Sequence, residues 1–339
     1  MATRNLTTNS LQALKKADGI VAFTSQELIK SYKVALVEIR KELDTLYKKF
    51  LTLKEPTKAQ LTQFMRKSKI EKEIVDIMRP FLTANEAFIK DMSVLGIDNG
   101  YFNNAWALDQ ASGVSLSWGM IDDTAVRAAA GIGGNVGNLT GLLTSFEIKQ
   151  HQKLLTEAFK NYDQDTIRWI SRDIRQGILQ GESAVKVARR IQRSGITKSF
   201  NSAMKISRTE ILRATGLSGQ IAYEEARGFG VDINEIWDAT LDNRTRPEHA
   251  TADGEIKDNE TGFFSVPWGE VTGPRRSGIA SQDIFCRCIS VGEVEGYSPE
   301  LRRVRGEGLQ PVQTFKEWAK TNDITVNRFG QKYNFEIGA

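Results

Sequence analysis

The sequence predicts an α+β protein with a predominantly helical N-terminal and middle region, a small C-terminal α+β module and an extended tail. Apolar residues recur at steps of three and four through most of the first 230 residues, which is the period of an amphipathic helix. After Gly230 apolar and polar residues alternate instead, a pattern typical of strands. The length of 339 residues is sufficient for about two domains of roughly 150 residues each.

The predicted organisation has five parts. A helical N-terminal region at 1–130 is followed by a glycine-rich hinge at 131–141 and a helical middle region at 142–230. An α+β module at 231–295 and a basic tail at 296–339 complete the chain. The glycine-rich segment does not follow a strand and contains no Gly-Lys-Ser/Thr, so we interpret it as a hinge rather than a phosphate-binding loop.

The first predicted helix is long and amphipathic. Between Thr24 and Phe50 its apolar residues form one stripe, made of Leu28, Tyr32, Ala35, Ile39, Leu43, Leu46 and Phe50. Two interpretations stay open for this stripe. It is either the seam on which a partner helix docks or a face that packs inside its own helical bundle.

Two further helices are predicted by capping-box patterns. Thr57 with Gln60 indicates one helix start, and Thr83 with Glu86 indicates a second, with Pro80 between them. The Gly, Asn and Ser content then rises between Gly96 and Trp118. We therefore expect a loop-rich connection there.

The middle region predicts three helices. The first carries apolar residues from Ile167 to Ile178 and ends at Gly181, and Ser183 begins the second. The second helix places Arg189, Arg190 and Arg193 on its outer face, and a third helix is predicted at 201–226. His151 lies in a polar stretch and is expected at the surface.

The α+β module is predicted from three strand patterns. They lie at 231–242, with one interruption read as a bulge, at 262–266 and at 289–294. A basic turn at 302–308, a short helix at 315–319 and an extended tail are expected to follow.

A short helix is predicted to begin at Pro247, with the residue before it extended and Gly254 near the helix end. His249 and Asp253 are four residues apart and are expected on one face of this helix. Asp242 is expected to cap the turn after the first strand. Arg244 and Arg246 are expected to pair with carboxylates.

Cys286 and Cys288 are the candidate metal ligands. Two residues apart on one strand, their Cα atoms would be about 6.5–7 Å apart, which is marginal for a disulfide and suitable for two thiolates on one metal. His249 is the candidate third ligand, with Asp253 or water as the fourth. We expect no bound cofactor, and zinc is the alternative that these residues allow. The alternative is a nuclease-like site in which Asp242, His249 and Asp253 hold a divalent ion.

The segment Arg208-Thr209-Glu210 is predicted to lie on a helix. Arg208 and Glu210 would be about 200° apart around that helix, so they cannot both point into one transferase pocket. Glu210 is expected to pair with Arg213, and Arg208 to reach the neighbouring α+β module. We therefore interpret the segment as a structural joint.

Three stretches occur in the order of a known family: ISRTEILRA at 206–214, WDATLDNRTRPEHATADGE at 237–255 and DIFCRC at 283–288. Over roughly residues 163–292 the chain resembles the phage Mu F-like minor head proteins, also called phage head morphogenesis proteins. The residues that carry the resemblance, expected to be mainly structural, are Arg208, Thr209, Glu210, Trp237, Asp242, Arg244, Thr245, His249, Asp253, Gly254, Cys286, Arg287 and Cys288. Family members with a fuller cysteine set have Cys in the places of Arg246 and His249, and Arg246 departs from that pattern.

The resemblance implies a low-copy minor capsid protein of the virion, without enzymatic activity. It implies association with the portal and other head or scaffold proteins, and a role in head assembly, genome packaging or DNA ejection. The implied location is inside the head near the portal, after assembly in the host cytoplasm. The N-terminal region is the candidate docking part.

Composition agrees with such a protein. The net charge is only +4, so we expect weak DNA contact at most, through Arg189, Arg190 and Arg193 and through the basic residues Arg302, Arg303 and Arg305. No apolar run approaches the roughly twenty residues that span a bilayer, and no secretory signal is visible. We expect no membrane partner and a reducing, intracellular environment.

Overall fold

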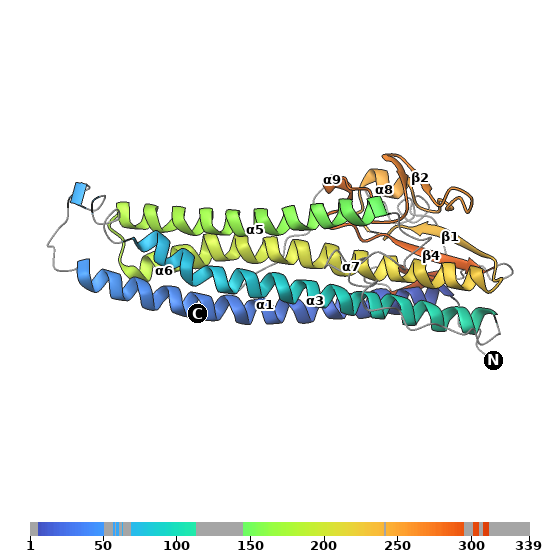
Figure 1. The fold of residues 1–339 in the computed structure, drawn as a ribbon, viewed down its shortest axis with the longest axis horizontal. Helices are drawn as coiled ribbons and strands as arrows, with labels where there is room; N and C mark the ends of the chain where they lie inside the picture. The colour runs from blue at the N-terminus through green and yellow to red at the C-terminus, as the bar shows by residue number, and fades with distance from the viewer. Residues whose placement is uncertain are drawn as a thin grey trace. The chain divides into compact units, whose positions relative to one another are not determined.

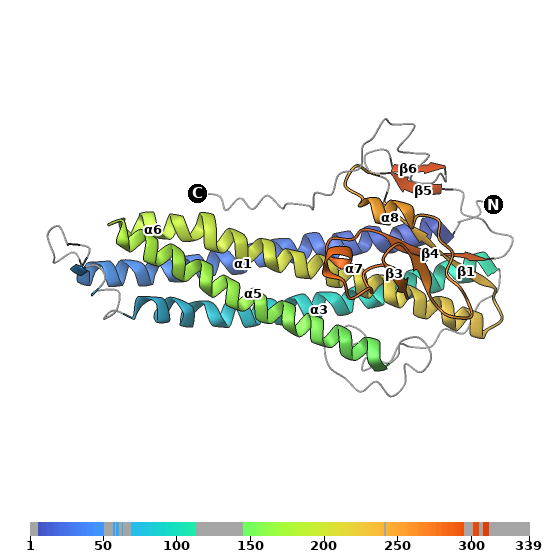
Figure 2. The ribbon, with the colours of Figure 1, turned by 90° about the horizontal axis from the view of Figure 1, so that it is seen from above.

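The computed structural model describes residues 6–50, 57, 59–60, 63, 69–112, 145–240, 242–294, 301–304 and 308–311. The helices of the N-terminal and middle regions are α1 (Leu6–Phe50), α3 (Ile70–Ser112), α5 (Ser145–Leu179), α6 (Ala184–Ile191), the π-helix η1 (Gln192–Ile196) and α7 (Thr197–Gly228), seen in Figure 1. The C-terminal elements are β1 (Ile233–Asp238), α8 (Pro247–Thr251), β2 (Phe264–Val266), β3 (Gly269–Val271), α9 (Ala280–Asp283), β4 (Ile289–Val294), β5 (Leu301–Val304) and β6 (Gly308–Pro311). Figure 1 labels β2 and α9, and Figure 2 labels the others. Helices followed by short antiparallel strands confirm the predicted α+β class.

The chain divides into two compact units. We call the first the mixed unit, and it comprises the described residues of 1–22, 90–155 and 207–331. We call the second the helical unit, and its described residues lie within 23–89 and 156–206. The five predicted parts and their boundaries stay a prediction. None of the helices in the described part of the chain has the length and apolarity that crossing a membrane requires.

In the helical unit, the apolar stripe of α1 is buried. Leu28, Tyr32, Ala35, Ile39 and Leu43 are all inaccessible to solvent, so the stripe packs inside its own bundle. Of the two interpretations, a docking seam is therefore wrong for these five residues. The side chains at 46 and 50 lie outside the described residues.

A neutral polar network crosses the interior of the helical unit. The Tyr32 hydroxyl lies 2.5 Å from the Tyr162 hydroxyl and 2.6 Å from Ser199 Oγ. Ser199 also lies 2.8 Å from the Thr166 hydroxyl, and the Asn85 amide donates to Tyr162 at 3.3 Å. Four helices contribute to it, and each hydroxyl has at least one partner, as burial requires.

Of the two predicted capping boxes, the structure forms the first and not the second. The Thr57 and Gln60 box, which precedes α3, is confirmed, because the Gln60 side chain accepts from the Thr57 backbone N–H at 2.8 Å. The second box is wrong, since α3 runs through Pro80 and Thr83 without interruption. Met78 and Leu82 are buried on either side of the proline, so packing outweighs the one backbone hydrogen bond that proline removes.

The loop predicted from Gly96 is also wrong as far as residue 112, where α3 ends. A Cβ at Gly100 would lie 2.1 Å from the Thr215 carbonyl oxygen of α7, so glycine permits close packing of the two helices. The Tyr223 hydroxyl of α7 donates to the Asn104 side chain at 2.9 Å. The small and polar residues that suggested a loop thus serve a helix interface. The remainder of that predicted loop and the 131–141 hinge lie outside the described residues.

The predicted helices of the middle region are confirmed. α5 ends before Gly181, whose φ of +66° is in the left-handed region, and the Ser183 hydroxyl caps α6 by accepting from the Lys186 N–H at 3.4 Å. Arg189 and Arg193 are exposed as predicted. Arg190 is instead half-buried and donates to the Glu182 carboxylate at 3.1 Å.

Strands β1, β2 and β4 of the mixed unit lie within the three predicted strand segments, whereas β3 was not predicted. β1 pairs antiparallel with β4 from Ile233 opposite Val294 to Asp238 opposite Ile289, and β2 pairs with β3. β5 and β6 form another antiparallel pair in the segment predicted as a basic turn. The helix expected at 315–319 lies outside the described residues. Helices α3 and α7 and strands β1 and β4 together form a hydrophobic core. Its residues include Tyr101, Leu108, Leu217, Ile221, Tyr223, Ile233 and Val294.

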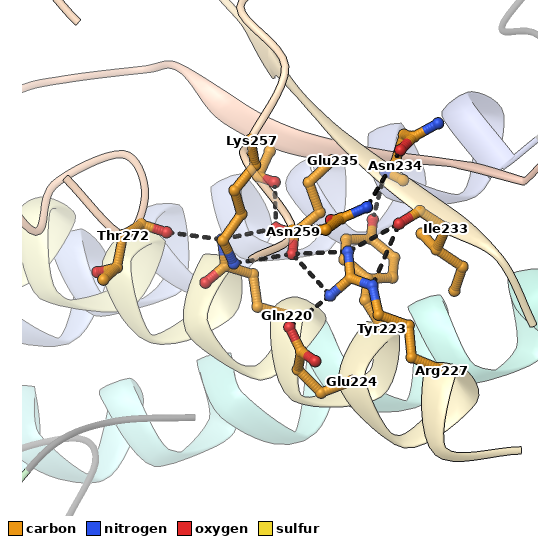
Figure 3. A network of polar contacts seen from close by, with 12 residues as sticks. Gln220, Tyr223, Glu224, Arg227, Ile233, Asn234, Glu235, Lys257, Asn259 and Thr272 are labelled. Atoms are coloured by element: carbon orange, nitrogen blue, oxygen red, sulfur yellow. Dashed lines mark hydrogen bonds and ion pairs between the residues drawn. The ribbon is translucent and has the colours of Figure 1, made fainter. Parts of the chain in front are cut away.

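The bulge predicted in β1 is absent from the described strand. The apparent interruption of the apolar pattern is Glu235, a charged residue at an inward-facing position. Glu235 is fully buried between Ile233 and Trp237, and the alternation of β1 is regular. Its carboxylate binds Lys257 and Arg227, as Figure 3 shows. The carboxylate lies 2.9 Å from Lys257 Nζ and 3.3 Å from the Arg227 guanidinium. The remaining hydrogen bonds to it come from Gln220 Nε2 at 2.7 Å and Ser290 Oγ at 2.8 Å.

Candidate functional site

The family-like residues of α7 act as a joint, although with partners that differ from the prediction. Glu210 pairs with Arg213 at 3.0 Å as predicted, and also with His151 at 3.1 Å. Burial alone would raise the pKa of Glu210, but the charges of Arg213 and His151 outweigh burial and lower this pKa to about 2. His151 is thus an internal partner, and its predicted surface position is wrong.

The other two residues of this segment point in different directions. Arg208 pairs with Asp18 of α1 at 3.3 Å, so the prediction that it reaches the α+β module is wrong. The Thr209 hydroxyl does make that contact, because it accepts a hydrogen bond from the backbone N–H of Phe285 at 3.4 Å. Arg208 and Glu210 therefore have separate partners, and they form no common pocket.

Asp242 organises the turn that follows β1. Its Oδ1 accepts from the backbone N–H of Arg244 at 2.9 Å, which is the cap predicted from the sequence. The Arg287 guanidinium binds both carboxylate oxygens, one of them at 2.5 Å, whereas Arg244 Nε lies 3.9 Å away. Thr245 donates to the Thr240 carbonyl within the same turn. Asp242 is thereby fully engaged by the chain itself.

Arg246 and Asp253 bond to backbone atoms. Arg246 donates to the carbonyls of Gln282, at 3.2 Å, and Ile284, so the carboxylate partner predicted for it is wrong. Asp253 accepts from the Ala239 N–H at 2.8 Å. α8 begins at Pro247 as predicted but ends at Thr251, so Asp253 lies beyond the helix and does not share its face with His249.

Three buried side chains converge beneath α8. His249 Nδ1 lies 3.3 Å from Cys288 Sγ and 3.5 Å from Cys286 Sγ, and both cysteines are free thiols. The two cysteines lie in the irregular segment before β4, so their predicted place on a strand is wrong, yet both sulfurs face the same imidazole nitrogen. Their ligand atoms all lie within 4.8 Å of one another, which is close enough for one metal ion to bind all three side chains.

The imidazole of His249 is held by its surroundings. Gln282 Oε1 lies 3.0 Å from Nε2 and accepts from it, which leaves the Nδ1 lone pair directed at the two sulfurs. The Trp268 ring stacks on the imidazole with centroids 4.5 Å apart, and Trp237 packs against it edge to face. The ring therefore has little freedom to turn away.

Arg275 holds the backbone of the cysteine segment. Its guanidinium is buried and donates to the carbonyls of Cys286 at 3.1 Å, Cys288 at 2.6 Å and Leu212 of α7 at 2.9 Å. Burial raises the pKa of a thiol, but hydrogen bonds with Cys288 and His249 and the charge of Arg275 lower the pKa of Cys286 well below its ordinary value. Burial and the neighbouring Cys286 raise the pKa of Cys288.

A small pocket opens onto the cluster. Its lining includes the cluster residues together with Thr240, Arg244, Thr245, Arg246, Phe285 and Arg287. No carboxylate from the described residues lines this pocket. Asp242, His249 and Asp253 do not converge, so the structure does not assemble the nuclease-like site considered as the alternative.

Sequence reasoning missed Gln282, Trp268 and Arg275. Gln282 is four residues before Cys286, but only the fold directs its side chain at the imidazole. Arg275 has a φ of +64° inside a Gly-Pro-Arg-Arg-Ser-Gly segment. That composition could have indicated a tight turn, while nothing in it indicated a buried guanidinium.

Comparison with known proteins agrees with the resemblance. Residues 168–291 match the family model described as Phage Mu protein F like protein. The chain is 27% identical over 336 residues to NAD(+)--arginine ADP-ribosyltransferase EFV of Enterococcus faecalis (strain ATCC 700802 / V583), covering 99% of this chain and 64% of that protein. It is also 27% identical over 315 residues to Minor head protein GP7 of Bacillus phage SPP1, covering 90% of this chain and 95% of that protein. No solved structure matches.

Proposed function

From the match of residues 168–291 to the model of the Phage Mu protein F like family, we propose that the chain is a minor head protein of a phage. The observation that carries the proposal is the match to Minor head protein GP7, which extends over nearly the whole length of both chains. In this proposal the protein is a low-copy virion component that helps head assembly and genome packaging or ejection. It lies inside the head near the portal, after assembly in the host cytoplasm.

The proposed partners are the portal and other head or scaffold proteins. The buried stripe of α1 leaves this contact to other surfaces, and α1 contributes residues to both compact units. Deleting the first 55 residues would therefore damage the fold as well as any docking site. The suitable test uses the full, tagged chain, co-expressed with the portal protein of the same phage or prophage and analysed by cross-linking mass spectrometry. Reproducible cross-links to the portal are expected, and their absence in a folded, soluble preparation would contradict the contact.

A structural role without catalysis is part of the proposal. It is supported by the partners of the two candidate carboxylates: Asp242 is bound by Arg287 and Asp253 by the Ala239 N–H, and neither belongs to the group that His249 forms with the two cysteines. The chain spans 64% of the length of the relative named as an ADP-ribosyltransferase.

Two activity assays test this absence of catalysis. We expect no transfer of ADP-ribose from NAD to arginine and no cleavage of plasmid with Mg²⁺, Mn²⁺ or Zn²⁺. Robust cleavage that is lost in a folded Asp242→Asn variant would contradict the proposal, as would arginine modification that is lost in Glu210→Gln.

Weak DNA contact is the remaining part of the proposal. Arg189 and Arg193 are exposed, whereas Arg190 is engaged by Glu182. The side chains of Arg302 and Arg303 on β5, and the residue at 305, lie outside the described residues. Each phosphate that the protein neutralises adds about 1 to the magnitude of the slope of log affinity against log salt, so losing two such contacts in Arg189→Gln/Arg193→Gln should reduce this magnitude by about 2. Arg190→Gln is the matched control, and equal effects of both variants would contradict the assignment.

A further inference from the structure

We propose that His249, Cys286 and Cys288 bind one zinc ion, with the fourth coordination position supplied by solvent through the adjoining pocket. The three side chains are buried and come from α8 and from the segment that precedes β4. A metal here would join these two parts of the mixed unit. The inference rests on the side chains themselves and is independent of the proposed role in the phage head.

The spacing of the donor atoms fits a tetrahedral zinc. With Zn–S of about 2.3 Å and Zn–N of about 2.0–2.1 Å, tetrahedral angles place nitrogen about 3.5 Å from each sulfur. The two observed distances from His249 Nδ1 are 3.3 and 3.5 Å. A hydrogen bond donated from the ring accounts for at most one of these two contacts, since Nδ1 carries at most one proton.

The type of donor selects the metal. Thiolate and imidazole are the ligands that zinc prefers, whereas magnesium and calcium require oxygen donors, which the three side chains of this cluster do not supply. Gln282 Oε1 accepts from Nε2, so the ring presents its unprotonated nitrogen to the metal. Such an outer partner of a histidine ligand is a regular feature of zinc sites.

The fourth position faces the pocket. Arg246 lines that pocket, but a guanidinium has no free lone pair for a metal and donates here to the carbonyls of Gln282 and Ile284. Arg246 thus fixes the distance between α8 and the cysteine segment without acting as a ligand. Three protein donors with an accessible fourth position leave a coordination site for water.

Metal content and cobalt absorption test the proposal on the full chain. Protein purified from zinc-supplemented medium is expected to hold about one zinc per chain, measured by elemental analysis. Apo protein titrated with Co²⁺ should develop thiolate-to-metal charge transfer in the near ultraviolet and strong visible bands of tetrahedral geometry. A metal-free protein that binds neither Zn²⁺ nor Co²⁺ would overturn the proposal. So would an intact mass showing a disulfide between the two cysteines in protein that has been reduced and then purified again.

Variants separate a ligand from a structural role. Cys288→Ser should lose the metal and the cobalt charge-transfer band, and Gln282→Ala should weaken zinc binding about 10–100-fold while Gln282→Glu retains it. His151→Gln replaces the other histidine of the chain and should keep one zinc per chain. If Cys288→Ser does not fold, the comparison between Gln282→Ala and Gln282→Glu still decides. Equal zinc affinity in both would contradict the proposed ring orientation and with it the site.

Discussion

The two compact units bury polar groups in different ways. The helical unit holds a neutral network in which Tyr32 contacts Tyr162 and Ser199. The mixed unit holds a charged network in which Glu235, completely buried, is bound by Lys257 and Arg227. Removing one partner of a neutral hydroxyl costs little unfolding free energy, because the hydroxyl keeps its hydrogen bond to another partner. A buried carboxylate requires compensation by its cations, so its network is far less tolerant of substitution.

The largest effect that would sharpen this contrast is expected for Glu235→Gln. The change keeps the shape of the side chain but leaves Lys257 and Arg227 without their common counter-charge, so we expect a loss of about 3–5 kcal/mol of unfolding free energy. Urea denaturation followed by circular dichroism measures this loss. Glu224→Gln is the control, because its carboxylate also pairs with Arg227 but at a more exposed position, and should cost about 0–1 kcal/mol. Equal losses for both variants would break the contrast.

The second effect concerns acid, and it involves Glu210 in the mixed unit. Its pKa of about 2 in the folded protein lies below its ordinary value of 4.5, so ionised Glu210 stabilises the fold above pH 4.5. This stabilisation is lost as the pH falls from 4.5 towards 2, and it amounts to about 3 kcal/mol at about 1.4 kcal/mol for each pKa unit. Glu210→Gln should therefore be less stable than the wild type at pH 7 and should approach it near pH 2. Urea titrations at pH 7, 4 and 3 test this, and a constant difference across them would contradict the assignment.

The smallest effect is expected in the neutral network. Tyr32→Phe removes one hydroxyl, but Tyr162 retains Asn85 and Ser199 retains Thr166, so the loss should be about 1 kcal/mol. Burial raises the pKa of Tyr32 and of Tyr162 above the ordinary tyrosine value, so both stay neutral throughout the acid and neutral range. The effect of Tyr32→Phe should thus be the same at pH 4 and pH 8. A loss as large as that of Glu235→Gln would remove the distinction between the two interiors.

The same contrast explains what the sequence could predict. Elements held by apolar periodicity, such as the stripe of α1, were recognisable because hydrophobic spacing reports which face is buried. Local chemistry also located the Ser183 cap and the start of α8 at Pro247. The loop predicted from Gly96 is wrong because the glycines and asparagines of this segment pack against α7. That contact depends on residues more than one hundred positions away, which no local pattern reports.

Part of the candidate metal site was also recognisable. His249, Cys286 and Cys288 were selected from residue type and spacing, and the structure brings these three together. Asp253 is one of the two candidates for the fourth ligand, with water as the other, and its carboxylate accepts from the Ala239 N–H instead because α8 ends at Thr251. Arg275 is buried by the tertiary fold, and no local pattern reports a charged side chain that is compensated by distant carbonyls.

The central claim is that this chain is a structural component of a phage head. Quantitative mass spectrometry of heads purified from the phage or prophage that encodes the chain tests it most directly. The claim predicts that the protein is present in washed heads at a small, constant ratio to the major capsid protein. Heads that contain no trace of it, while the protein is abundant in the producing cells, would contradict the claim.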